Sequence, residues 1–462
     1  MTTQPPGPRL GSIRLLGFLA LVAGASCAPH STWAETAPAT AHEVASRPDW
    51  QLESVVIVSR HGVRSPTKTK PPLAMLTHKD WPTWPVQPGE LTARGASLIG
   101  QMGGYYGAWL RQEQVLPAGA CPAPNQVAAW ADVDQRTRLT GDALLEGIAP
   151  GCTLRASHQQ ALDQDDPVFH ATESGQCKLD PATARAAIDA RLDGEGLDTV
   201  TDRYRASLEQ MEKVLDFSRS PYCEHDKPGA ECRFSTLANR VQIDATGRHL
   251  RLDGPLGIAS TVSEVFLLEY AQGMAPENVA WGAIHDRDDW ARLLAAHNAQ
   301  FDLMAKTPYL ATRKGTPLMA DILGALTQSA TGTPAFATHA PASSRVYVLA
   351  AHDTNLANLA GMLGLDWTLP DQPDDTPPGG ALVFSLWRDK LAHADFVTVE
   401  LVYQSLSQLR EMKPLTLADP PSRHALAIPE CADSAHGNAC RLDRFMSIAR
   451  RSLAPDCLVG HE

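Results

Sequence analysis

Three short apolar runs, each followed at once by charged residues, limit most strongly how this chain can fold. The runs and the residues after them are Val55–Val58 with Arg60-His61-Gly62, Val127–Ala131 with Asp132, and Val346–Ala350 with His352-Asp353. Apolar runs of this length, bounded by polar residues, are typical of buried strands. Because ligands bind at the carboxyl ends of strands in open α/β sheets, we expect the three charged clusters to meet in one crevice.

Helical patterns fill the sequence between and after these runs. They cover residues 140–148, 263–272, 289–306 and 356–363, with Gly273 closing the second and Thr354 or Asn355 capping the last. The alternation of strand and helix patterns predicts an α/β fold in which helices flank a central mixed sheet. Few strand patterns occur within 155–310, so we expect a mostly helical inserted domain there. The α/β domain is then predicted at 48–154 and 311–462.

The N-terminus has the pattern of an export signal. Arg9 and Arg14 form a positively charged region before an apolar run, Leu15–Ala25, which is too short to span a bilayer. We expect residues 1–34 to be a signal peptide and processed lead-in, and the mature protein to be periplasmic or secreted and not held in a membrane. A lipoprotein-like site at Cys27 is an alternative. Small-residue cleavage patterns end at Ala28, Ala34 and Ala41.

The cysteine count supports export. Of nine cysteines, eight remain when Cys27 is removed with the signal, and an even number in an exported chain predicts four disulfides. The short spacings Cys223/Cys232 and Cys431/Cys440 suggest local loops. No pair has the spacing of a zinc or redox site.

The net charge excludes one class of partner and suggests another. A formal charge of -12 makes the chain a poor general binder of nucleic acid. Any basic cluster must be local, which suits a small anion. The segment Arg60 to Lys68 is such a cluster, with two guanidinium groups, a lysine and one imidazole. Guanidinium groups match phosphate oxygens, Gly62 permits close approach of a ligand, and His61 can attack phosphorus through one ring nitrogen.

The other two clusters complete a phosphate site. Asp353 is a candidate general acid for the leaving oxygen, and its proton affinity should rise once phosphate is bound. His352 can donate a hydrogen bond to the phosphate, and Arg136 adds a third guanidinium. Asp132 can orient the basic residues or the nucleophile. Asp132 could alternatively be the nucleophile of a magnesium-dependent phosphatase, but Arg136 stands where that motif requires Thr or Val. The chain has no thiolate phosphatase loop, phosphate-binding P-loop or HExxH motif.

These residues resemble the histidine acid phosphatases, and among them the bacterial phytase branch. The motif Arg-His-Gly-x-Arg-x-Pro matches Arg60 to Pro66, the His-Asp pair matches His352-Asp353, and the Arg-Thr pair matches Arg136-Thr137. The likeness runs from about residue 51 to 457. It implies a phosphohistidine at His61, proton donation by Asp353, and phosphate binding by Arg60, Arg64, Arg136 and His352, without a metal or other cofactor. It also implies the disulfides Cys121–Cys152, Cys177–Cys457, Cys223–Cys232 and Cys431–Cys440.

Substrate choice is less constrained than the chemistry. Thr67 and Lys68 match the phytase pattern, and Glu264, Arg313 and Lys314 stand where similar phytases have pocket residues. Two departures are Ser65 in place of Ala and Lys314 in place of Arg. We therefore expect a monomeric acid phosphomonoesterase that acts on phytate. The alternatives are a broad or sugar-phosphate phosphatase resembling the glucose-1-phosphatases, and a binding protein without turnover, against which His61 and Asp353 argue.

Overall fold

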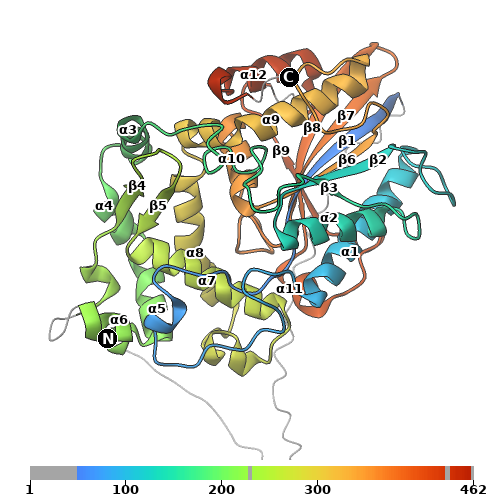
Figure 1. The fold of residues 1–462 in the computed structure, drawn as a ribbon. Coiled ribbons are helices and arrows are strands. Elements are labelled where there is room, and N and C mark those ends of the chain that lie inside the picture. The colour runs from blue at the N-terminus through green and yellow to red at the C-terminus, as the bar shows by residue number, and fades with distance from the viewer. Residues whose placement is uncertain (1–48, 227–231, 432–437, 459–462) are drawn as a thin grey trace, which may run out of the picture. The chain divides into compact units, whose positions relative to one another are not determined.

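The three apolar runs form neighbouring parallel strands at the centre of one sheet in the computed structural model (Figure 1). They are β1 (Trp50–Arg60), β6 (Val346–Ala351) and β2 (Val127–Ala131), in the spatial order β1-β6-β2. The structure describes residues 49–226, 232–431 and 438–458. The predicted signal peptide, its candidate cleavage positions and Cys27 lie outside the described residues.

The remaining strands make the sheet mixed, as predicted. Its order is β10-β8-β7-β1-β6-β2-β3, and β9 pairs with β8. Strand β3 (Ser157–His158) is parallel to β2, whereas the pairs beyond β1 on the other side are antiparallel. The antiparallel strands are β7 (Ala381–Asp389), β8 (Ala394–Tyr403), β9 (Ser422–Leu426) and β10 (Cys440–Arg441).

Helices cover both faces of the sheet because its central strands are apolar on both sides. Along β1, Val56 and Val58 enter one core, and Val55 and Ile57 enter the core on the opposite face, as the two-residue period of a strand requires. The first core contains side chains of α9 (Pro308–Thr331), α10 (Asp353–Leu363) and α12 (Leu442–Arg451). The second contains side chains of α1 (Ala93–Gln112) and α2 (Gln135–Ile148).

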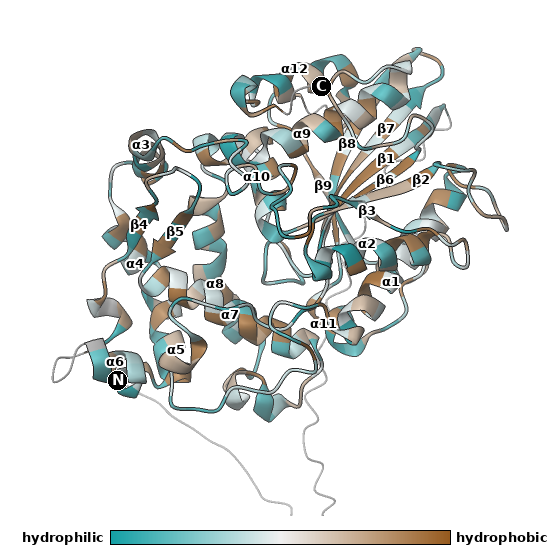
Figure 2. Cartoon of the chain, viewed as in Figure 1, coloured by the Kyte–Doolittle hydropathy of each residue, from teal (hydrophilic) through white to brown (hydrophobic). Residues whose placement is uncertain are grey.

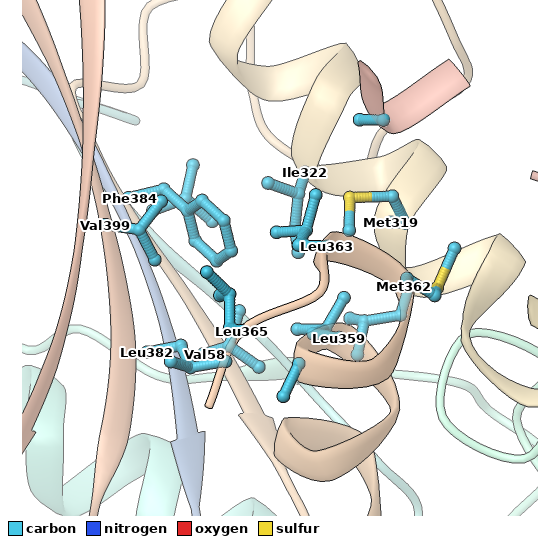
Figure 3. Packing of buried hydrophobic residues seen from close by; sticks show 14 of the residues in the cluster. Val58, Met319, Ile322, Leu359, Met362, Leu363, Leu365, Leu382, Phe384 and Val399 are labelled. Atoms are coloured by element: carbon cyan, nitrogen blue, oxygen red, sulfur yellow. The ribbon is translucent and has the colours of Figure 1, made fainter. Parts of the chain in front are cut away.

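The figures show this arrangement directly. The central strands are predominantly hydrophobic, whereas the covering helices also carry hydrophilic residues (Figure 2). In Figure 3, Val58 and Phe384 of the sheet face Met319 of α9 and Leu359 of α10. Burial of such side chains from water is the main free-energy source for this packing, at about 25 cal/mol per Å² of apolar surface.

The part of the sequence between β3 and β6 contains a second group of helices, which shares a hydrophobic core of its own. Its elements are α3 (Pro181–Arg191), α4 (Leu197–Arg203), α5 (Arg205–Leu215), α6 (Pro221–Asp226), the hairpin β4 (Arg240–Ile243) with β5 (Leu250–Asp253), α7 (Pro255–Ala271) and α8 (Arg287–Met304). The short helix α11 (Leu406–Glu411) follows β8 and contacts α7. The described residues fall in one compact unit, so the predicted boundaries of an inserted domain stay a prediction.

The helix boundaries correct the sequence predictions in three places. Helix α2 begins at Gln135 and not at residue 140, so Arg136 lies in its first turn. Helix α7 begins at Pro255 and not near residue 263. The sequence pattern did not reveal this start because the first two turns are buried nearly all round and show no amphipathic period. Helix α10 is capped by His352, and the prediction of Thr354 or Asn355 as the cap was wrong. Asn355 instead accepts the His352 amide at 3.0 Å from inside the first turn. Gly273 follows α7 with a φ of 78°, the predicted helix end.

The four disulfides implied by the family resemblance are present. They are Cys121–Cys152, Cys177–Cys457, Cys223–Cys232 and Cys431–Cys440. Within the described ranges, no helix has both the length and the apolar character needed to cross a bilayer.

Candidate active site

The sheet register brings the three charged clusters to one edge. Arg60, the last residue of β1, is paired with Ala351 of β6, and Ala131 of β2 is paired with Ala350. The next residues along the chain follow this register, because the His61 amide donates to the Ala351 carbonyl at 3.0 Å and the Asp132 amide donates to the Ala350 carbonyl at 3.1 Å. Backbone hydrogen bonds therefore bring the three charged clusters together at the carboxyl ends of these strands, as predicted.

His61 is held in one tautomer. Its Nδ1 lies 2.9 Å from the Gly62 carbonyl oxygen, which can only accept, so Nδ1 carries the hydrogen and Nε2 keeps its lone pair. Burial lowers the pKa of His61 well below its usual value, and Arg136, Arg64 and Arg60 lower it further. The imidazole is consequently neutral, with a nucleophilic nitrogen on Nε2.

Gly62 is required by packing against α1. A Cβ atom on Gly62 would lie 2.7 Å from Ile99 Cγ1 and 2.9 Å from the Gly95 carbonyl oxygen. The sequence interpretation, close approach of a ligand, had assigned a different reason to this glycine. The contact with α1 fixes the backbone that supplies the carbonyl acceptor for His61.

Arg60 and Arg64 face a set of carboxylates. Arg60 is fully buried and pairs with Asp353 at 2.9 Å, with Asp374 at 3.0 Å and with Glu264. Nη2 of Arg64 lies 3.0 and 3.1 Å from the two oxygens of Glu264. Burial would lower the pKa of Arg60, but its three carboxylate neighbours outweigh that effect and raise it. Both guanidinium groups are thus fixed in place and charged.

Asp353 is ionised while no phosphate is bound. It is the first residue of α10, with one oxygen 2.9 Å from Arg60 and the other accepting the Thr354 amide at 2.7 Å. Burial alone would raise the pKa of Asp353, but the nearby positive charges of Arg60 and Arg64 dominate and lower it to about 2. The ion pair with Arg60 therefore stabilises the ionised carboxylate of Asp353.

His352 and Arg136 close the other side of the crevice. His352 Nε2 lies 2.7 Å from Asp132 Oδ2, and its Nδ1 lies 3.5 Å from Arg136 Nη2. The His352 and His61 ring centroids are 5.6 Å apart. Arg136 also pairs with Asp134 at 2.6 Å. The site thus gathers three guanidinium groups and two imidazoles at one edge of the sheet.

A metal ion has one candidate set of ligands among the described residues. Asp132, Asp134, His170 and His352 each offer a ligand atom, and these atoms lie within 4.8 Å of one another. In the structure Asp132 Oδ2 already accepts from both imidazoles, at 2.7 and 3.0 Å. Asp132 is also fully buried, which makes it a poor nucleophile and weakens the magnesium-dependent alternative.

Comparison with known proteins fits this geometry. A family model for the histidine phosphatase superfamily (branch 2) matches residues 51–404. The chain belongs to this superfamily. It is 41% identical to the phytase AppA of Escherichia coli (strain K12) over 413 residues, 89% of this chain and 94% of that protein. It is 31% identical to a glucose-1-phosphatase of Salmonella typhimurium over 431 residues, covering 92% of this chain and 96% of the other.

Solved structures give the same assignment. The Hafnia alvei phytase in its apo form superposes with a TM-score of 0.84 at 46% identity, covering 89% of this chain and 99% of that one. This histidine phosphatase is therefore a phosphoric monoester hydrolase, and its mixed α/β fold is that of the phytase structures.

The other predicted residues of this histidine phosphatase are exposed or contact other side chains. Glu264 contacts the arginines, so it is placed to orient them. Lys68 and Thr67 are exposed. Thr67 lies near Gly89, whose carbonyl oxygen faces Arg136. Lys314 lies 3.5 Å from Glu173. Arg313 is held by both oxygens of Asp456 at 2.8 Å and by the Lys178 carbonyl at 2.9 Å.

Two functional neighbours were missed by the sequence reasoning. Asp374, which pairs with Arg60, stands in an irregular segment just before the Thr376-Pro377-Pro378 run. His170, which pairs with Asp132 at 3.0 Å, lies in the loop between β3 and α3. Neither follows a strand or belongs to a periodic pattern, so a fold was needed to find them. The only available signal was the density of charges around Asp374.

Proposed function

We propose that this histidine phosphatase hydrolyses phosphate monoesters through a phosphohistidine at His61, with phytate (inositol hexakisphosphate) as its substrate. The observation that carries the proposal is the state of His61, a buried neutral imidazole whose Nδ1 hydrogen is bonded to the Gly62 carbonyl. Its free Nε2 lies among guanidinium groups that can hold the charged oxygens of a phosphoryl group.

The proposed reaction has two steps. In the first, a bond forms between His61 Nε2 and phosphorus while the bond from phosphorus to the alcohol oxygen breaks, and Asp353 gives its proton to that oxygen. In the second, water attacks phosphorus, its proton passes to Asp353, and the phosphorus–nitrogen bond breaks to release inorganic phosphate. Arg60, Arg64 and Arg136 bind the non-bridging oxygens throughout. His352 joins them as an imidazolium that keeps its Nε2–H on Asp132 and donates its Nδ1–H to the phosphate.

Phosphate binding itself is proposed to prepare the acid. Asp353 must be protonated for the first step, yet its pKa is about 2 in the free site because of Arg60 and Arg64. A bound phosphate takes hydrogen bonds from these arginines and adds negative charge beside Asp353. Both effects raise the pKa of Asp353, so turnover is expected in acid.

Similarity supports phytate over other esters. Phytases share 41% and 46% identity with this chain, and the Hafnia alvei phytase was also solved in complex with myo-inositol hexakis sulphate, at a TM-score of 0.82. Thr67, Lys68 and Lys314 are the proposed contacts for the outer phosphates. The glucose-1-phosphatase at 31% identity supports the second candidate, a sugar-phosphate phosphatase. If glucose 1-phosphate has a far higher kcat/KM than phytate at acidic pH, the second candidate replaces the first.

The decisive experiment for the chemistry is trapping of the intermediate. The enzyme is mixed with a radiolabelled ester at acidic pH. One portion is quenched in alkali, in which phosphohistidine survives, and another in acid, in which an aspartyl phosphate survives, and both are digested. Label is expected on the peptide that contains His61. Label on the peptide with Asp132, together with strong inhibition by EDTA, would instead support the magnesium-dependent reaction.

We also propose that the mature protein is a periplasmic or secreted monomer. Four disulfides suit an oxidising compartment. Cell fractionation, the mass of the mature chain and light scattering of the purified protein check the compartment, the cleavage position and the oligomeric state. A mature chain that keeps residues 1–27 would overturn the export signal.

A further inference from the structure

One carboxylate oxygen near the active site serves two imidazoles. Oδ2 of Asp132 lies 2.7 Å from His352 Nε2 and 3.0 Å from His170 Nε2. The His170 and His352 ring centroids are 5.0 Å apart. An ionised carboxylate only accepts hydrogen bonds, so each of these nitrogens carries a hydrogen and donates it to the same oxygen.

The loop that carries His170 is anchored to the elements that carry its partners. Trp130 of β2 donates to Asp166 Oδ2 at 2.9 Å, and Asn355 of α10 donates to the Phe169 carbonyl at 2.8 Å. Phe169 is itself buried. The backbone beside His170 is therefore tied to β2, which leads to Asp132, and to α10, which follows His352.

His170 matters more for the orientation of the Asp132 carboxylate because the second oxygen of that carboxylate is not held. Oδ1 is buried and has no hydrogen-bond partner among the side chains and backbone that the structure describes. With one donor instead of two on Oδ2, little would prevent the carboxylate from turning about its Cβ–Cγ bond. His352 would then lose the fixed acceptor that sets its Nε2–H tautomer and directs Nδ1 toward Arg136.

We propose that His170 is a positioning residue, whose hydrogen bond holds the Asp132 carboxylate in the orientation that aligns His352 with the bound phosphate. The inference rests on the proposed phosphatase function. His170 does not contact the reacting atoms. The charged groups around it are Asp132 and His352, Glu173 and Asp165 in its own loop, and Lys314 of α9, which pairs with Glu173.

A double-mutant cycle tests this role with p-nitrophenyl phosphate as substrate and inorganic phosphate as inhibitor. Loss of a hydrogen bond to a charged group predicts that His170→Ala lowers kcat/KM about tenfold and weakens inhibition by phosphate. His170→Gln places an amide Nε2 donor close to the position of the imidazole Nε2 and should stay within about threefold of the wild type. In a His352→Ala background, His170→Ala should cause less than about a twofold further loss, because the side chain that His170 aligns through Asp132 is then absent.

His339→Ala is the matched control. It removes another imidazole–carboxylate pair, His339 Nδ1 to the buried Asp321 at 2.7 Å, so it can lower the melting temperature without changing kcat/KM. Additive losses in the double mutant, equal losses for Gln and Ala at position 170, or a wild-type kcat/KM in His170→Ala would each overturn the inference. Absence of turnover by the wild-type enzyme would instead overturn the proposed function.

Discussion

At the scale of single residues, the same arginines set two opposite catalytic states. Positive charge disfavours imidazolium and favours carboxylate, so Arg60 and Arg64 help to lower the pKa of both His61 and Asp353. The lowered pKa of His61 suits its role as nucleophile, because a neutral imidazole has a free lone pair. The lowered pKa of Asp353 opposes its role as acid, because this carboxylate must gain a proton before it can donate one. Substrate binding therefore has to raise the pKa of Asp353 while His61 stays neutral.

Replacement of the acid should depend on the leaving group. In Asp353→Asn the amide cannot give up a proton, so kcat for phytate is expected to fall by about 10² to 10⁴, the usual contribution of general acid catalysis. With p-nitrophenyl phosphate, whose leaving oxygen needs little protonation, the fall should be much smaller. Steady-state kinetics on the two esters check this, with His61→Ala as the control that should lose both activities. Equal losses in Asp353→Asn would contradict the acid role.

The pH profile should identify the same group. The pKa of His61 is lowered well below its usual value, so this nucleophile stays neutral in moderately acidic solution. The pKa of Asp353 is about 2 in the free enzyme and is raised by bound phosphate, so kcat should be high in acid and fall as the pH rises through the raised value. Measurement of kcat against pH checks this. The fall on the alkaline side should flatten in Asp353→Asn, and an unchanged profile would contradict the assignment.

At the scale of elements, α7 links the helical core to the active site. Its Glu264 contacts Arg60 and Arg64, whereas Glu269, farther along the helix, is buried and accepts the Ala280 amide at 2.9 Å. Burial raises the pKa of Glu269 to about 8, a shift that this single amide opposes only in part. The helix therefore carries one carboxylate stabilised by cations and one that is stable in the fold mainly when protonated.

Glu269→Gln should make the protein less sensitive to rising pH. The folded pKa of Glu269, about 8, lies above its ordinary value of 4.5, so the folded state holds a proton that the unfolded state releases between these pH values. Stability from this group is complete below about pH 4.5 and declines toward pH 8. The variant should match the wild type near pH 4 and be more stable at pH 8, by roughly 1 to 3 kcal/mol. Urea denaturation at both pH values checks this, and an equal difference at both would contradict it.

At the scale of the whole molecule, one disulfide joins distant parts of the chain. Cys177, in the same loop as His170, is bonded to Cys457 near the C-terminus, across a sequence separation of 280. Both cysteines are buried together with Ala171 and Ala454. Cys431–Cys440 closes a separation of only 9. The first bond restricts the unfolded chain far more than the second.

Removal of these two disulfides should therefore differ in cost. Replacement of Cys177 and Cys457 by Ser is expected to lower the free energy of unfolding by about 3 to 5 kcal/mol, and replacement of Cys431 and Cys440 by about 1 to 3 kcal/mol, because closure entropy grows with loop length. Denaturation midpoints of the two double variants check the order. A larger loss from the short loop would show that native packing, not chain entropy, dominates.

The family and the chemistry of the site could be predicted from the sequence. Apolar runs that end in Arg60-His61, Asp132 and His352-Asp353 determine buried strands with functional residues at one edge, because strand length and strand-end position are local properties. The disulfide pairing could be named only through the family resemblance, since spacing leaves several pairings open.

Only the tertiary structure decided which side chains share a partner. The sequence places His170 and Asp374 in irregular segments, and nothing local indicates that one meets Asp132 and the other meets Arg60. The same holds for the ionisation of Asp353, which depends on charges that arrive from β1 and the segment that follows it. Local patterns determine where strands and helices form, whereas contacts between distant segments set the distances and the burial on which hydrogen bonds and pKa values depend.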